Sequence, residues 1–193
     1  MTVIEFLKEE KINSSLIQGI VDFRASRPVR EEERGRIPVP RYLYYGREVW
    51  EQAIAALLCG QNLLLAGPKA TGKNILAQNL AAAFASGLIG TDTFENGAVV
   101  FRPGPVYRCG ISGGFGVLDE INMARNEALA VLHGILDFRR TIDVPGYDVV
   151  RMDEGTRFIA TMNYGYAGTR ELNEALTSRF SCLQMPAITG ENL

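Results

Sequence analysis

Residues 67–74 read Gly-Pro-Lys-Ala-Thr-Gly-Lys-Asn and match seven of the eight positions of a Walker A phosphate-binding loop. An apolar run precedes the loop at residues 62–66, and a helix-prone stretch follows it at residues 74–85. In such a strand–loop–helix context, inward-pointing backbone N–H groups and the helix N-terminus bind phosphate oxygens. The pattern predicts a nucleotide site formed by Gly67, Pro68, Lys69, Ala70, Thr71, Gly72, Lys73, Asn74 and Ile75.

Two side chains of this loop carry most of its chemistry. Lys73 is expected to bring a flexible positive charge to the outer phosphates. Asn74 stands where a Ser or Thr hydroxyl normally ligates Mg²⁺. Because the amide oxygen of an Asn can ligate Mg²⁺ directly or through a water, we expect nucleotide binding to survive this replacement while metal affinity falls.

Polar residues follow two further apolar runs. Asp119 and Glu120 come directly after residues 115–118, and Asn163 follows residues 157–162. If these runs are strands of a parallel sheet, their polar residues emerge at its carboxyl edge beside the phosphates. We expect Asp119 to hold Mg²⁺, Glu120 to polarise a water and Asn163 to position that water. The structural alternatives are an acidic helix cap and a turn-initiating Asn.

Predicted strands alternate with predicted helices, which indicates an α/β sandwich with a mostly parallel sheet. The predicted helices are residues 13–24, 48–59, 74–85 and 172–180, and one with Leu129, Leu132, Ile135 and Leu136 on its inner face. A fourth strand is predicted at residues 182–185. Asn96-Gly97 and Pro145-Gly146 predict two β-hairpins, the second with arms at residues 141–144 and 147–150. The expected organisation is an N-terminal helix with a polar linker at residues 1–36 and a nucleotide-binding core at residues 37–193.

Composition excludes several functional classes. The formal charge of −2 argues against a general electrostatic grip on nucleic acid. No apolar stretch approaches the roughly 20 residues of a membrane span, and residues 1–10 lack a signal-peptide layout, so a cytoplasmic location is expected. The three cysteines have no metal-binding spacing, and the single histidine, His133, has no companion.

Four motifs occur in order along the chain: Gly67–Asn74, Val117-Leu118-Asp119-Glu120-Ile121-Asn122, Ala160-Thr161-Met162-Asn163 and Leu172–Phe180. Together they resemble the AAA+ ATPases, specifically the MoxR-like and dynein-related branch, over roughly residues 42–193. The resemblance implies a P-loop NTPase three-layer sandwich with strand order 5-1-4-3-2 and ATP and Mg²⁺ as ligands. It also implies that the two hairpins are inserts that face remodelling partners.

The resemblance also assigns roles to individual residues. Asp119 matches the Walker B metal residue, with Asn74 as the second metal-binding position, and Glu120 matches the catalytic base. Asn163 matches sensor 1, and Arg179 matches the arginine finger that reaches a neighbouring subunit's site, with Arg170 as a competing candidate. Tyr45 and Gly46, together with Tyr44, match the loop lining the adenine pocket.

Two departures from that family pattern are expected to matter, besides Asn74. Only residues 87–114 separate the Walker A helix from the Walker B strand, so the edge strand of the family's sheet is expected to be absent. The sequence stops at Leu193, just after the fifth strand, without the helical lid that carries sensor 2.

The expected function is that of an ATPase subunit in a homo-oligomeric ring, six-membered by resemblance, which remodels a protein client. The isolated chain is expected to be weakly active. One alternative is a nucleotide-binding structural subunit with little hydrolysis. The other is a McrB-type GTPase of a DNA restriction system, although the chain lacks the basic surface that direct DNA binding favours.

Overall fold

The structure is a computed structural model that describes residues 1–85, 104–124, 126–143, 149–164 and 172–187. Its centre is a four-stranded parallel sheet with the order β2-β5-β1-β6. These strands are β1 (Asn62–Gly67), β2 (Phe115–Leu118), β5 (Arg157–Asn163) and β6 (Phe180–Gln184). The order reproduces the predicted 5-1-4-3 arrangement, and in the described part of the chain no strand lies beyond β2. The predicted fold class is confirmed.

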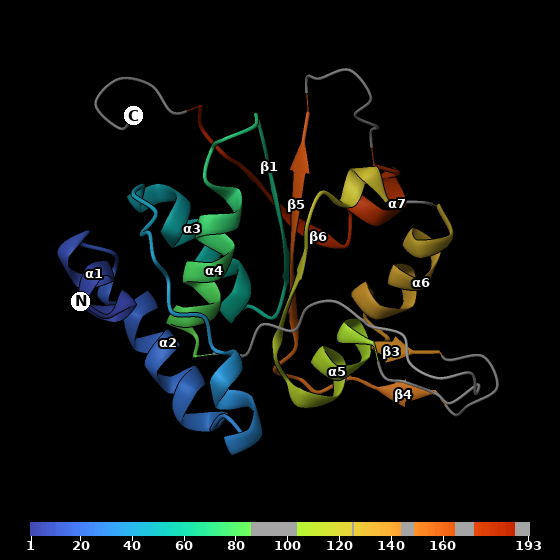
Figure 1. Cartoon of the computed structure of the whole chain (residues 1–193), viewed down its shortest axis with the longest axis horizontal. Helices are drawn as coiled ribbons and strands as arrows, with labels where there is room; N and C mark the ends of the chain where they lie inside the picture. Colours follow the sequence, from blue (N-terminus) through green and yellow to red (C-terminus); the bar gives the residue numbers. More distant parts are fainter. Residues whose placement is uncertain (86–103, 125, 144–148, 165–171, 188–193) are drawn as a thin grey trace.

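Helices cover both faces of the sheet, which gives three layers (Figure 1). One face carries α3 and α4 with α1 and α2 outside them, and the other carries α6 and α7. The side chains of β1 alternate accordingly, because Leu63 and Leu65 pack into the first core and Leu64 into the second. The helices are α1 (Val3–Glu9), α2 (Ser14–Ser26), α3 (Arg47–Leu58), α4 (Lys73–Ala83), α5 (Pro105–Ser112), α6 (Asn126–Leu136) and α7 (Glu174–Thr177), with 3₁₀ turns η1 (Glu31–Arg36) and η2 (Ile121–Met123).

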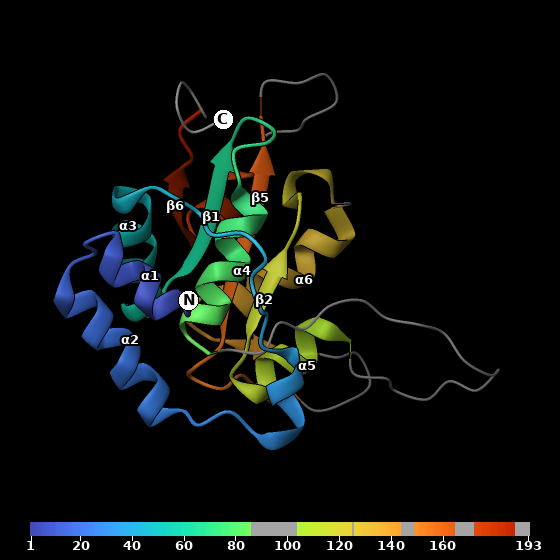
Figure 2. The same cartoon turned by 60° about the vertical axis from the view of Figure 1, so that its left-hand side comes forward.

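The N-terminal segment packs onto the nucleotide-binding core. It contains two helices rather than the single one predicted, and Phe6, Leu7 and Ile20 are buried in the same cluster as α3 and α4 (Figure 2). Arg24 Nη2 in α2 donates a hydrogen bond to the Ala82 carbonyl of α4 at 2.9 Å. Residues 1–26 therefore form an outer layer that shares one hydrophobic core with the sheet.

Two helices differ from the sequence-based expectation. Helix α5 was not predicted; it begins at Pro105, which supplies a helical φ, and ends before Gly113 in the left-handed conformation. Helix α7 spans one turn instead of residues 172–180, because Asn173 caps its first turn and the chain enters the sheet at Phe180, two residues before the predicted strand.

Of the described helices, none is long and apolar enough to cross a membrane.

Two residue pairs are present at the base of the second predicted hairpin, and its second arm reaches Arg151, one residue beyond the predicted bounds. Strand β3 (Thr141–Ile142) pairs antiparallel with β4 (Val150–Arg151), near the amino ends of the sheet strands (Figure 1). Its predicted turn, Pro145-Gly146, and the whole hairpin around Asn96-Gly97 lie outside the described residues.

Candidate functional site

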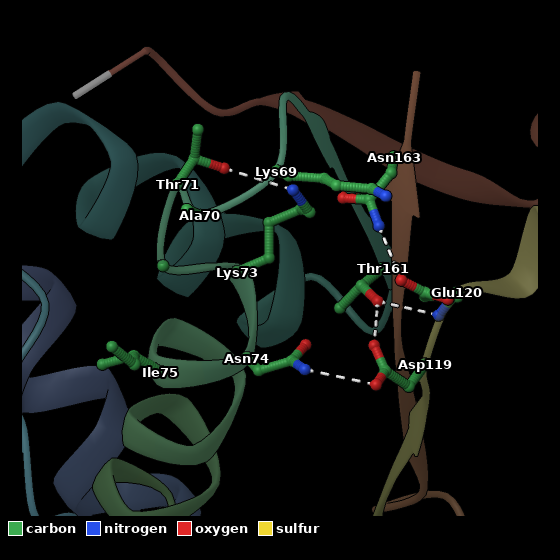
Figure 3. A pocket seen from close by; sticks show the side chains of 11 residues that line it. Lys69, Ala70, Thr71, Lys73, Asn74, Ile75, Asp119, Glu120, Thr161 and Asn163 are labelled. Atoms are coloured by element: carbon green, nitrogen blue, oxygen red, sulfur yellow. Dashed lines mark hydrogen bonds between the residues drawn. The ribbon is translucent and has the colours of Figure 1, made fainter. Parts of the chain in front are cut away.

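A cavity of about 410 Å³ opens at the carboxyl ends of β1, β2 and β5 (Figure 3). Polar groups meet there because parallel strands end at the same edge of a sheet and the loops that follow them converge. The lining residues come from the predicted loop and from the ends of β2 and β5: Lys69, Ala70, Thr71, Gly72, Lys73, Asn74, Ile75, Asp119, Glu120, Thr161 and Asn163.

The loop between β1 and α4 is tightly curled. Gly72 precedes α4 in the left-handed conformation (φ 77°), and a Cβ there would lie 3.0 Å from the Tyr44 ring, so both the conformation and the space favour glycine. At Gly67 a Cβ would lie 2.9 Å from Met185 Cβ. Ala70 also has a positive φ, 60°. The backbone thus adopts the conformation that the Walker A spacing predicts.

Lys73 is held inside the curl of this loop, with 7% of its surface exposed. Its Nζ donates to the carbonyls of Gly67 at 3.0 Å and Pro68 at 2.6 Å, and to Thr71 Oγ1 at 3.2 Å. Burial lowers the pKa of Lys73, and the negative charges of Asp119 and Glu120 oppose that change. A phosphate that reaches the ammonium group has to replace the loop's own oxygen acceptors.

Asp119 is held from two sides. The β2–β5 register pairs Leu118 with Ala160 and therefore places Asp119 beside Thr161. Thr161 Oγ1 donates to Asp119 Oδ1 at 2.5 Å, and Asn74 Nδ2 donates to Asp119 Oδ2 at 3.2 Å. The amide nitrogen of Asn74 is turned toward Asp119, and its amide oxygen points up into the pocket (Figure 3). A carboxylate and an amide oxygen are hard ligands that fit Mg²⁺, so the residues present are compatible with this metal.

Glu120 and Asn163 meet at the same edge. Asn163 Nδ2 donates to Glu120 Oε1 at 2.8 Å, and Asn122 Nδ2 donates to the Asn163 carbonyl at 2.9 Å. Glu120 has left-handed backbone angles (φ 48°, ψ 49°), a conformation that costs a non-glycine residue roughly 1–3 kcal/mol. This turn directs the Glu120 side chain toward the end of β5, where Asn163 donates a hydrogen bond to it.

The structure places Arg179 far from this pocket. Phe180 pairs with Asn62 at the beginning of β1, whereas Asn163 pairs with Gly67 at its end. Arg179 therefore lies at the amino edge of the sheet, where its guanidinium donates to the Ala175 carbonyl. Arg170, the competing candidate, lies outside the described residues.

Tyr45 and Gly46 are not among the residues that line the cavity. Tyr45 is 64% exposed and packs edge-on against Phe6, with ring centroids 5.2 Å apart. The preceding residue connects this segment to α4, because Tyr44 N donates to Asn79 Oδ1 at 2.9 Å. The predicted base-binding role of Tyr45 and Gly46 stays a prediction.

Sequence reasoning missed Thr161. Its hydroxyl contacts Asp119 and the backbone N–H of Glu120, although the residue is buried and lies between the apolar residues Ala160 and Met162. A usable signal was present: Thr161 lies two positions before Asn163 and therefore on the same face of the strand.

Comparison with known proteins agrees with this geometry. Residues 62–180 match the family described as AAA domain (dynein-related subfamily). The chain belongs to this family. The AAA domain accounts for the cavity at the carboxyl edge, since its matched region includes the Walker A loop and all the residues that line the cavity.

Similar proteins are longer than this chain. The uncharacterized protein YojN of Bacillus subtilis is 37% identical over 185 residues, which cover 86% of this chain and 61% of YojN. The uncharacterized protein SH1500 of Staphylococcus haemolyticus is 35% identical over 173 residues, or 79% of this chain and 66% of SH1500. The chain thus spans less than two thirds of either relative.

A crystal structure of NtrX from Brucella abortus in complex with ADP superposes with a TM-score of 0.52. It is 18% identical and covers 72% of this chain and 35% of the NtrX chain, so the similarity concerns the fold.

Proposed function

We propose that this AAA domain is the nucleotide-binding core of a MoxR-like ATPase that binds ATP with Mg²⁺ and hydrolyses it. The observation that carries the proposal is the convergence of Lys73, Asp119, Glu120 and Asn163, from three separate stretches of the chain, around one cavity. The family match and the fold shared with NtrX, which was crystallised with ADP, support it.

Each residue has a distinct part in the proposed reaction. The Lys73 ammonium faces the outer phosphates once they replace its loop acceptors, and Asp119 with Asn74 would hold Mg²⁺. The metal, when bound, supplies positive charge that offsets the charge on the phosphate oxygens. Glu120 Oε1 is held by Asn163, so the other carboxylate oxygen of Glu120 accepts the proton of the attacking water.

We further propose that the protein works as a closed ring of identical copies, six by family resemblance, which remodels a protein client in the cytoplasm. Arg179 supports the ring, because it lies at the amino edge of the sheet and its own chain's pocket is at the carboxyl edge. Its guanidinium would complete the pocket of a neighbouring copy. The client rests on family resemblance alone, since a fold does not define a client.

The proposal is tested by titrating ATP into the protein with and without Mg²⁺. We expect Mg²⁺-dependent binding, and we expect Lys73→Ala to weaken it about 10- to 100-fold, the size of a lost hydrogen bond to a charged group. Lys8→Ala, at an exposed position in α1, is the matched control. Absence of ATP binding by the wild-type chain would overturn the proposal, and preferential displacement of ATP by GTP would favour the restriction-type GTPase.

One observation favours a second function, a nucleotide-binding structural subunit with little hydrolysis. The Asn74 amide donates to Asp119, where the usual hydroxyl residue would offer an oxygen to the metal. Asn74→Thr separates the two functions in a single-turnover hydrolysis assay. Under our proposal the rate stays within about threefold of wild type, the effect of one weak hydrogen bond. An increase well beyond tenfold would mean that Asn74 suppresses hydrolysis and that the natural chain is a structural subunit.

A further inference from the structure

The Thr161 hydroxyl contacts both acidic residues of the cavity. It donates to Asp119 Oδ1 at 2.5 Å and accepts the Glu120 backbone N–H at 2.9 Å (Figure 3). We propose that Thr161 is a positioning residue that orients Asp119 and Glu120 together and thereby sets the affinity of the nucleotide site for Mg²⁺. This inference rests on the proposed function of the site.

The Thr161 hydroxyl is buried, so it needs hydrogen-bond partners within the protein. Only 1% of the residue is exposed, and its neighbours in β5, Ile159 and Ala160, are fully buried. A hydroxyl offers one donor and two acceptor positions, and an unpaired hydroxyl is costly to bury. Both contacts of Thr161 are therefore strongly favoured, and both are directed at the end of β2.

The contact with Glu120 acts on the backbone. Glu120 has left-handed angles, which an L-residue adopts only when neighbouring groups stabilise them. Its N–H is bound by Thr161, and its carbonyl accepts the Met123 N–H at 2.8 Å. These two bonds fix the turn that aims the carboxylate at Asn163.

The contact with Asp119 acts on the carboxylate directly. Oδ1 accepts the hydrogen bond from the Thr161 hydroxyl, so the carboxylate plane is fixed and Oδ2 faces Asn74. Hydrogen-bonded partners of this kind orient metal-binding carboxylates, and their loss typically lowers metal affinity about 10- to 100-fold. One hydroxyl thus couples the expected metal ligand to the expected base.

The test compares Thr161→Val, which keeps the shape and removes the hydroxyl, with Thr161→Ser, which keeps the hydroxyl. The measurement is the Mg²⁺ concentration that gives half of the Mg²⁺-dependent increase in ATP affinity, determined by calorimetry on the 193-residue chain. We expect Thr161→Val to raise this concentration about tenfold or more and Thr161→Ser to leave it within about threefold. ATP affinity without Mg²⁺ should be the same in all three proteins, because neither variant alters the phosphate loop.

The possible results distinguish a failure of the proposed function from a failure of the proposed role of Thr161. Wild-type protein that binds no ATP overturns the proposed function and the role of Thr161 with it. Wild-type protein that shows Mg²⁺-dependent binding, with Thr161→Val at the same Mg²⁺ midpoint, overturns only the role of Thr161. Loss of ATP affinity without Mg²⁺ in Thr161→Val would likewise overturn it, since that result indicates a general structural role. If Thr161→Val does not fold, as judged by circular dichroism, Thr161→Ala against Thr161→Ser makes the same comparison.

Discussion

Glu120→Gln is expected to slow ATP hydrolysis by about 100- to 10,000-fold, the usual contribution of a general base. An amide has nearly the shape of the carboxylate but does not accept a proton at neutral pH. Its carbonyl oxygen can still accept the hydrogen bond from Asn163 Nδ2 that Glu120 Oε1 accepts at 2.8 Å. The change therefore removes the base and keeps the geometry. Single-turnover hydrolysis, with protein in excess over ATP, measures the effect even if turnover is slow.

Binding distinguishes this loss from damage to the site. We expect Glu120→Gln to bind ATP with Mg²⁺ within about threefold of wild type, because Lys73 and Asp119 are unchanged. Glu9→Gln, which makes the same chemical change at an exposed position in α1, should hydrolyse ATP at the wild-type rate. A wild-type rate for Glu120→Gln would show that another group takes the proton.

Arg179→Ala is expected to lower hydrolysis by the assembled protein by about 1,000- to 100,000-fold, the range over which an arginine supplied to a phosphoryl-transfer site acts. ATP binding to a single chain should not change, since Arg179 lies at the opposite edge of the sheet from the pocket. Arg47→Ala is the matched control, because Arg47 is about half exposed and pairs with Glu51 of its own helix. The measurement is the hydrolysis rate per site under conditions in which the protein is oligomeric.

Mixing inactive variants tests whether Arg179 acts between copies. Arg179→Ala keeps an intact phosphate loop, and Lys73→Ala keeps an intact arginine, so a mixed assembly contains some complete sites. Hydrolysis per site should therefore rise on mixing above the rate of either variant alone. Recovery of no activity, with mixed assemblies demonstrated by size and by tagged pull-down, would contradict an action of Arg179 in a neighbouring site.

The parts of the fold that follow from local pattern could be predicted from sequence. Strand β2 has the predicted bounds, and β1 and β5 extend one residue beyond theirs, because each is an apolar run bounded by polar or glycine residues. Helix α5 was not predicted because its burial depends on a distant contact: a Cβ at Gly110 would lie 2.7 Å from Ile142 Cδ1 of β3. The helix also has only eight residues, fewer than the roughly 11 to 18 over which apolar periodicity distinguishes a helix.

The same distinction between local pattern and distant contacts applies to the residues of the candidate site. The loop, the acidic pair and Asn163 are recognisable because each lies at or directly after the end of a strand. The role of Thr161 depends on the register between β2 and β5, two strands separated in the sequence by α6 and the β3–β4 hairpin. The position of Arg179 likewise depends on how β6 aligns with β1. The register between strands depends on tertiary contacts, so it cannot be predicted from a single sequence.

Arg179 and the phosphate loop lie at opposite edges of the sheet, so each copy has two chemically different ends. One end of the β1–β6 pair would donate the arginine and the other would receive it. A two-fold symmetric dimer would complete both sites only if the face that joins the two copies carried both the arginine and the pocket. In the head-to-tail assembly proposed above, the arginine end of one copy would meet the pocket end of the next, and the terminal copy of an open chain would carry an incomplete site. Under that proposal each added copy would complete one site and closure would complete the last, so activity per copy should rise with assembly length.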